Sequence, residues 1–256
     1  MQRSILLLLP LLLAAGWLAA CTERTTGLEA GVEPSPTPLP RYDEPNLDPT
    51  TVAGYTWVIL TEVTPPGEQY PMAVTKREGA FLAPDRLREI AGGSRPGPWT
   101  SEVVQVGMQA RSRENVGSGL EPWRVRDGET LGRVVPGYLP YWDLFAPTPN
   151  GLAVTTPALE TDEYNGTSVL RYELPLATLP HLRQYLAEAI AAGVPGASAD
   201  PASLANLPVA YWLRVTDGRP VRIQIYPAAV LQPETGVSFN IRIQHETPGA
   251  IDIPDP

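Results

Sequence analysis

Apolar and polar residues alternate most clearly in the last third of the chain. Residues 209–215 are mostly apolar and residues 220–226 alternate, and the Asp217-Gly218 pair between them is typical of a tight turn. Residues 237–243 repeat the alternation. Together these segments predict a hairpin and a further strand of an antiparallel sheet with one apolar face, which another layer must cover.

Strand-like segments also precede this region. Each is rich in β-branched or aromatic residues or alternates in polarity, and several end at Pro, Gly or Asp-Gly turns. The expected strands are residues 55–63, 70–75, 101–108, 123–126 and 168–174. The loops between them are rich in Pro and Gly.

Three segments have helical features. Residues 179–192 place Leu182 and Leu186 on one apolar stripe, which predicts an amphipathic helix. Residues 138–145 are short and strongly aromatic, and residues 85–90 are expected to form a third short helical turn. The predicted fold class is therefore α+β, an antiparallel sheet with a few helices on its concave side.

The start of the chain has the pattern of a secretory signal. Arg3 precedes an apolar run over residues 5–18, which is short and is broken by Pro10, unlike a membrane span. The run ends in Leu-Ala-Ala-Cys, which resembles the lipobox of bacterial lipoproteins, where the cysteine receives a diacylglycerol. We therefore expect cleavage after residue 20 and a membrane anchor on Cys21.

The predicted organisation has three parts: a signal peptide over residues 1–20, an anchored Pro-rich tether over 21–50, and a folded domain over 51–256. The expected location is the extracytoplasmic side of the cell membrane. Thr22 stands where inner-membrane lipoproteins often have aspartate, which favours the outer membrane in an organism with two membranes.

Composition excludes several classes of function. The mature chain keeps 18 basic and 28 acidic residues, a net charge of −10. This acidic surface argues against nucleic acid as a partner, because such binding needs clustered Lys and Arg. With Cys21 acylated, no thiol remains for a disulfide, a thiolate metal site or a nucleophile.

Candidate catalytic chemistry is sparse. His181 and His245 are the only histidines, and both are expected at the solvated surface. Glu160, Asp162 and Glu163 form an acidic cluster that lacks the spacing of a calcium loop and is expected to be solvated. The sequence holds no Gly-rich phosphate loop and no Gly-x-Ser-x-Gly elbow. We expect a protein that is not an enzyme and takes no cofactor or metal.

The order of motifs resembles a known family. In the C-terminal third these motifs are, in order, a strand, an Asp-Gly turn, a strand beginning Pro-Val-Arg-Ile, a long return strand and an apolar end at 251–254. They resemble the LolA-like lipoproteins, in particular the mycobacterial LppX, LprA, LprF and LprG group. Residues 163–172 and 102–107 are similar to earlier parts of that group, so the resemblance covers about 52–254. It implies a strongly curved half-barrel over an apolar cavity that binds acyl chains of lipids, glycolipids or lipoproteins and carries them in the envelope.

The resemblance transfers no fixed ligand motif, so the expected cavity lining is a set of large apolar side chains. The candidates are Trp57, Trp123, Tyr141, Trp142, Leu144, Phe145, Leu182, Leu186 and Trp212, and Trp99 belongs to the same aromatic set that could line a cavity. The same residues are equally suited to a packed core. The expected protein is a monomer that binds lipid. The alternative is an RseB-like sensing module of the same fold, which binds a protein partner and transports no ligand.

Overall fold

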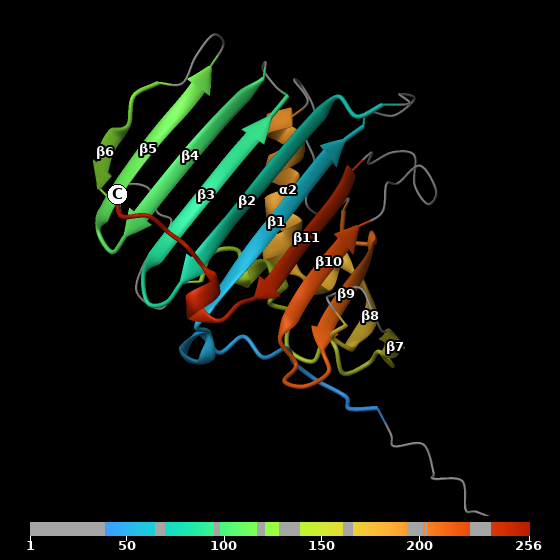
Figure 1. The fold of residues 1–256 in the computed structure, drawn as a ribbon. Coiled ribbons are helices and arrows are strands. Elements are labelled where there is room, and N and C mark those ends of the chain that lie inside the picture. The colour runs from blue at the N-terminus through green and yellow to red at the C-terminus, as the bar shows by residue number, and fades with distance from the viewer. Residues whose placement is uncertain are drawn as a thin grey trace, which may run out of the picture. The chain divides into compact units, whose positions relative to one another are not determined.

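A computed structural model describes residues 39–64, 70–94, 98–116, 121–127, 139–160, 166–193, 202, 204–225 and 237–256. Eleven strands form one antiparallel sheet in the order β6-β5-β4-β3-β2-β1-β11-β10-β9-β8-β7 (Figure 1). The strands are β1 (Gly54–Val63), β2 (Ala73–Leu82), β3 (Arg86–Gly93), β4 (Trp99–Val106), β5 (Gln109–Val116), β6 (Arg124–Asp127), β7 (Ala158–Glu160), β8 (Val169–Pro175), β9 (Pro208–Arg214), β10 (Pro220–Ile225) and β11 (Val237–His245). The described helices are α2 (Pro180–Gly193) and the 3-10 turns η1 (Pro49–Thr51), η2 (Trp142–Phe145), η3 (Leu176–Thr178) and η5 (Pro248–Ala250).

The sheet consists of two meanders that meet at its centre. Strands β1 to β6 pair in sequence order, as do β7 to β11, and β1 pairs with β11 from Tyr55↔His245 to Val63↔Val237. Strands β6 and β7 are the two edges, so the sheet does not close. The predicted open antiparallel sheet is confirmed, including the β9–β10 hairpin and β11.

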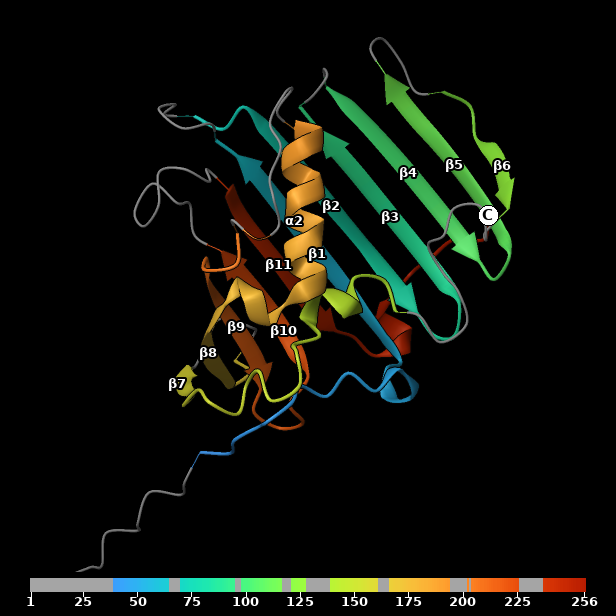
Figure 2. The same ribbon diagram turned by 180° about the vertical axis from the view of Figure 1, so that it is seen from behind.

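One face of the sheet carries the helical layer. Figure 2 shows α2 lying over the central strands, and its Leu182, Leu186 and Ile190 are buried at helical spacing. The sequence predicts a few helices in this layer. The described residues form one α-helix and short 3-10 turns. The aromatic segment forms only η2, because Tyr141 just before it is in the left-handed region (φ 62°) and Ala146 after it is extended.

Two buried tyrosines hold η2 against the sheet. The hydroxyl of Tyr55 on β1 donates to the carbonyl of Pro140 at 2.7 Å, and that of Tyr211 on β9 donates to the carbonyl of Phe145 at 2.9 Å. Each hydroxyl is deeply buried, and a buried hydroxyl without a hydrogen bond would destabilise the fold. These two hydrogen bonds remove that cost. The chain entering and leaving η2 is therefore tied to two distant strands of the sheet.

The predicted helical turn over residues 85–90 is wrong. This segment belongs to β3, where Leu87, Glu89 and Ala91 are buried and alternate with more exposed residues. The polar Glu89 on the buried face hides the strand alternation from a hydrophobicity pattern, and the apolar pair Leu87 and Ile90 imitates helical spacing. Strands β5 and β7 were also not predicted.

Part of the segment predicted as tether contacts the folded domain. The hydroxyl of Tyr42 donates to the carbonyl of Val215 at 2.8 Å, and the backbone of Asn46 donates to the carbonyl of Gly218 at 2.9 Å. Gly218 has φ +70°, and a Cβ there would lie 2.7 Å from the Tyr42 ring. The chain is thus held against the β9–β10 turn from about residue 41, while the boundary at residue 50 stays a prediction.

Candidate functional site

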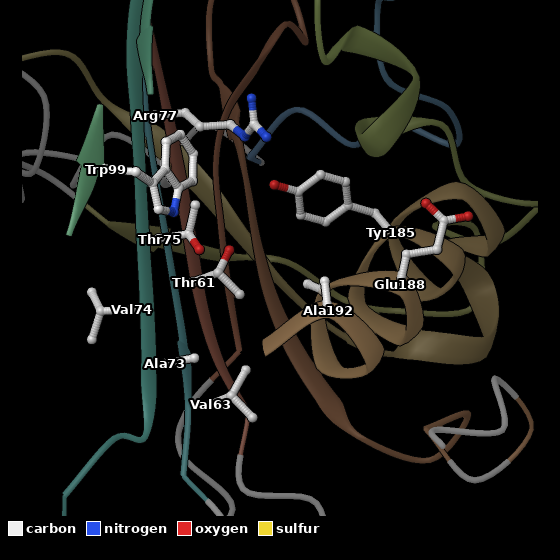
Figure 3. A pocket seen from close by; sticks show the side chains of 11 residues that line it. Thr61, Val63, Ala73, Val74, Thr75, Arg77, Trp99, Tyr185, Glu188 and Ala192 are labelled. Carbon is white, nitrogen blue, oxygen red and sulfur yellow. The ribbon is translucent and has the colours of Figure 1, made fainter. Parts of the chain in front are cut away.

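A groove of about 300 Å³ lies between the C-terminal half of α2 and the sheet (Figure 3). Strands β1 and β2 form its floor, Trp99 at the start of β4 forms one side, and α2 forms its roof. The lining residues are Thr61, Val63, Ala73, Val74, Thr75, Arg77, Trp99, Tyr185, Glu188, Ala189 and Ala192. Most of them are small or polar, and Trp99 is the one among them that belongs to the aromatic set expected as a possible cavity lining.

The groove exists because small residues face each other across the helix–sheet interface. The first half of α2 presents Leu182 and Leu186, which are completely buried and fill the space above the sheet. One and two turns later the helix presents Ala189 and Ala192, and the strand below carries Ala73. Side chains of this size leave the volume unfilled, so the groove follows from the helix sequence.

Two aromatic residues shape the walls. A Cβ at Gly93 would lie 2.6 Å from the indole nitrogen of Trp99, so only glycine at this position lets the indole lie against β3. On the helix side, the Tyr185 ring packs edge-on against Phe239 of β11, with 5.8 Å between the ring centroids. Both rings are therefore held by the sheet.

The basic residue of the groove, Arg77, belongs to a buried network. Arg77 Nη1 lies 3.1 Å from Oε1 of Glu89, whose side chain is only 2% exposed, and the Tyr141 hydroxyl donates to the other carboxylate oxygen. Burial lowers the pKa of Arg77, but the neighbouring Tyr141 and Glu89 outweigh it, so the net pKa is raised. The guanidinium is therefore charged and neutralised by a carboxylate from β3.

Two buried polar atoms of residues that line the groove lack hydrogen-bond partners among the described residues. The Thr61 hydroxyl and the Arg77 Nε are both buried and make no hydrogen bond. Thr61 pairs with Thr75 in the β1–β2 register, and Figure 3 shows both side chains on the strand wall with the Tyr185 hydroxyl pointing toward the sheet. The groove thus combines apolar surface with a polar patch, defined here as Thr61, Thr75, Arg77 and Tyr185.

The predicted lining residues lie elsewhere in the described structure. Trp57, Trp142, Leu144, Phe145, Leu182 and Leu186 are buried in the main core, and Tyr141 is partly buried against it. Trp212 lies on the opposite face, where its Nε1 donates to Glu160 at 2.7 Å and Arg222 stacks over its ring. Trp123 is 39% exposed beneath Arg113. A role in lipid binding for these residues stays a prediction, and Cys21 lies outside the described residues.

The structure also shows where the two histidines and part of the acidic cluster lie. His181 is exposed, as predicted, but His245 is not a solvated residue: its ring packs edge-on against Trp142 and its Nε2 lies 3.2 Å from the carbonyl of Pro220. Glu160 pairs with Arg171, while Asp162 and Glu163 lie outside the described residues. Within the described ranges no three His, Cys, Asp or Glu side chains are grouped to hold a metal ion.

A second hollow of about 480 Å³ lies at the β5–β6 edge and includes Pro256. It is larger than the groove, but its walls include the exposed side chains of Met108 and Val125. It lacks the enclosing helix that gives the groove two opposed walls, so we regard the groove as the candidate site.

The fold places the chain in the class of open antiparallel sheets with one helix packed on a face. No protein-family model and no curated protein matches the sequence. Among solved structures, a LolA superfamily protein from Nitrosomonas europaea is 10% identical, with a TM-score of 0.24, over 80% of this chain and 89% of its own. A domain described as an outer membrane lipoprotein-sorting protein from Vibrio parahaemolyticus is 11% identical, with a TM-score of 0.24, over 76% and 86%.

A third solved structure, a DUF1329 family protein from Desulfovibrio piger, is 9% identical, with a TM-score of 0.22, over 76% of this chain and 85% of its own. The first of the three carries the name of the family that the sequence resembles. Among the described helices, none has the length and hydrophobicity needed to cross a membrane.

Proposed function

We propose that this protein is a membrane-anchored lipoprotein of the extracytoplasmic side that binds a lipid acyl chain in the groove between α2 and the sheet and holds it or passes it on. The observation that carries the proposal is the groove itself, with Val63, Ala73 and the two alanines of α2 as apolar surface. Each methylene group removed from water contributes about 0.8 kcal/mol, so even part of one alkyl chain binds usefully.

The size of the groove limits the ligand. At about 300 Å³ it lies at the lower end of the range for ligand pockets. It therefore suits part of a single chain rather than several chains together.

The anchor on Cys21 supplies the location in this proposal. Residues 22–40 lie between the lipidated cysteine and the first contacts with the folded domain at Arg41. Proline-rich chain extends by about 3.1 Å per residue, so the tether reaches up to roughly 60 Å from the membrane. The domain can thus exchange ligand within that distance while it remains attached.

Filling the groove is expected to abolish lipid binding. In Ala189→Trp, the indole occupies the space between α2 and β1, and bound lipid per protein should fall on the order of tenfold. Ala191→Trp is the matched control, because Ala191 is exposed on the same helix and does not line the groove. The measurement is mass spectrometry of organic extracts from equal amounts of the purified full chains.

Equal lipid content in the wild type, Ala189→Trp and Ala191→Trp would contradict the proposal, because the lipid would then not depend on the groove. Circular dichroism of all three proteins shows that each is folded.

A further inference from the structure

The polar patch inside the groove has a feature that hydrocarbon binding does not explain. Thr61 is only 3% exposed and its hydroxyl has no hydrogen-bond partner, although it faces the groove. A buried hydroxyl without a partner costs about 1–3 kcal/mol, and valine has nearly the same shape without that cost. The neighbouring Nε of Arg77 is likewise buried and unpartnered.

These groups offer complementary hydrogen bonds to a ligand. The Thr61 hydroxyl can donate and accept, and the Arg77 Nε can only donate. Thr75 lies directly across from Thr61 in the strand register, and Figure 3 shows the Tyr185 hydroxyl directed at the same region from α2. A ligand with oxygen atoms at this position would satisfy atoms that the protein leaves unsatisfied.

The charges around the groove select against an anion. Arg77 lies 3.1 Å from the buried carboxylate of Glu89, so its positive charge is already balanced. Glu188 on α2 adds a negative charge to the lining. A fatty-acid carboxylate would therefore enter a site without net positive charge, whereas a neutral head bearing hydroxyl and ester oxygens meets no such opposition.

We infer that the groove binds a neutral single-chain amphiphile, with its hydroxyl or ester oxygens at the polar patch and its alkyl chain along Val63, Ala73 and Ala192. This inference rests on the proposed function and specifies its ligand class. Thr61 and Arg77 are the ligand-contacting residues, and the small volume admits one chain.

The test compares three probes of equal chain length: 1-monododecanoylglycerol, dodecanoate and dodecane. Binding to the full chain in nanodiscs is followed by tryptophan fluorescence, since Trp99 lines the groove, and Trp99→Phe identifies the part of the signal that comes from it. The measured quantity is the ratio of wild-type to variant affinity for each probe, in which partitioning into the lipid cancels.

Thr61→Val is expected to weaken monododecanoylglycerol binding about fivefold and to leave dodecane binding unchanged, and Thr61→Ser should stay within about twofold of the wild type for both. Glu188→Gln should strengthen dodecanoate binding about twofold and leave the glyceride unchanged. Without ligand, Thr61→Val should shift the denaturant midpoint upward, because it removes the unpartnered hydroxyl.

Other outcomes distinguish a failure of this inference from a failure of the proposed function. Binding of all three probes with no effect of Thr61→Val overturns this inference and leaves the proposed function standing. Dodecanoate binding that Glu188→Gln does not strengthen overturns the choice of a neutral head. A lower denaturant midpoint for Thr61→Val assigns Thr61 a structural role and also overturns the inference. No binding of any probe overturns the proposed function itself.

Discussion

Replacing Glu89 with alanine should lower the free energy of unfolding by about 3 kcal/mol, because it leaves the partly buried Arg77 guanidinium without its carboxylate. Glu89 is 2% exposed, lies 3.1 Å from Arg77 and accepts the hydroxyl of Tyr141. It therefore joins β2, β3 and the segment before η2 through one carboxylate. Equilibrium denaturation of the full chain measures the loss.

Glu78→Ala on β2 is the matched control. Glu78 pairs with Lys76 at 2.7 Å, but both side chains are about half exposed, so its removal should cost no more than about 1 kcal/mol. Similar losses for Glu89→Ala and Glu78→Ala would show that the buried network does not hold this face of the sheet together.

Mild acid should destabilise the folded chain through His245. Burial lowers the pKa of His245 to about 4 from its ordinary 6.5, and the nearby Arg214 and Arg219 add to this. Between these two pH values His245 therefore binds a proton in the unfolded chain but not in the folded chain. The contribution of His245 to the free energy of unfolding is fully present above pH 6.5 and is lost as the pH drops toward 4. The two pKa values correspond to a loss of about 3 kcal/mol.

His245→Gln should flatten this part of the stability profile. Glutamine keeps a donor for the carbonyl of Pro220 but does not titrate, and groups shared by both proteins cancel in the difference between their profiles. Denaturant unfolding across the window gives the difference directly. A His245→Gln profile parallel to that of the wild type would show that His245 is not the acid-sensitive group.

Strands with regular alternation could be predicted from the sequence, whereas the second half of β2 and all of β3 could not. In β10 and β11 the inward residues, which are Ile223, Ile225 and alternate residues of 239–243, are apolar and pack against the core, so the pattern has period two. On β2 the first inward residues beyond the predicted segment 70–75 are Arg77 and Gly79, which give no apolar face. Gly79 is required there, because a Cβ would lie 2.4 Å from the Trp57 ring and from the Arg88 carbonyl.

The candidate lining residues also divide into those whose position could be deduced from the sequence and those whose position could not. Alternation along β9 places Tyr211 and Leu213 toward the core and Trp212 on the other face, and this could have been deduced from sequence. The predicted lining was chosen mainly from large aromatic residues, and side chains of that size tend to fill the core rather than leave a cavity. The groove is left open by small residues between two aromatic walls, and its sequence signal is the pair Ala189 and Ala192 that follows Leu182 and Leu186 on α2.

The position of a bound lipid tests the central claim most directly. We would add a monoacylglycerol with a photoreactive diazirine in its chain to the full-length protein, irradiate it, and map the labelled peptides by mass spectrometry. The proposal predicts labels on residues 61–63 and 73–77 and on the second half of α2, all lost in Ala189→Trp. Labelling confined to other parts of the chain, and unchanged in Ala189→Trp, would contradict it.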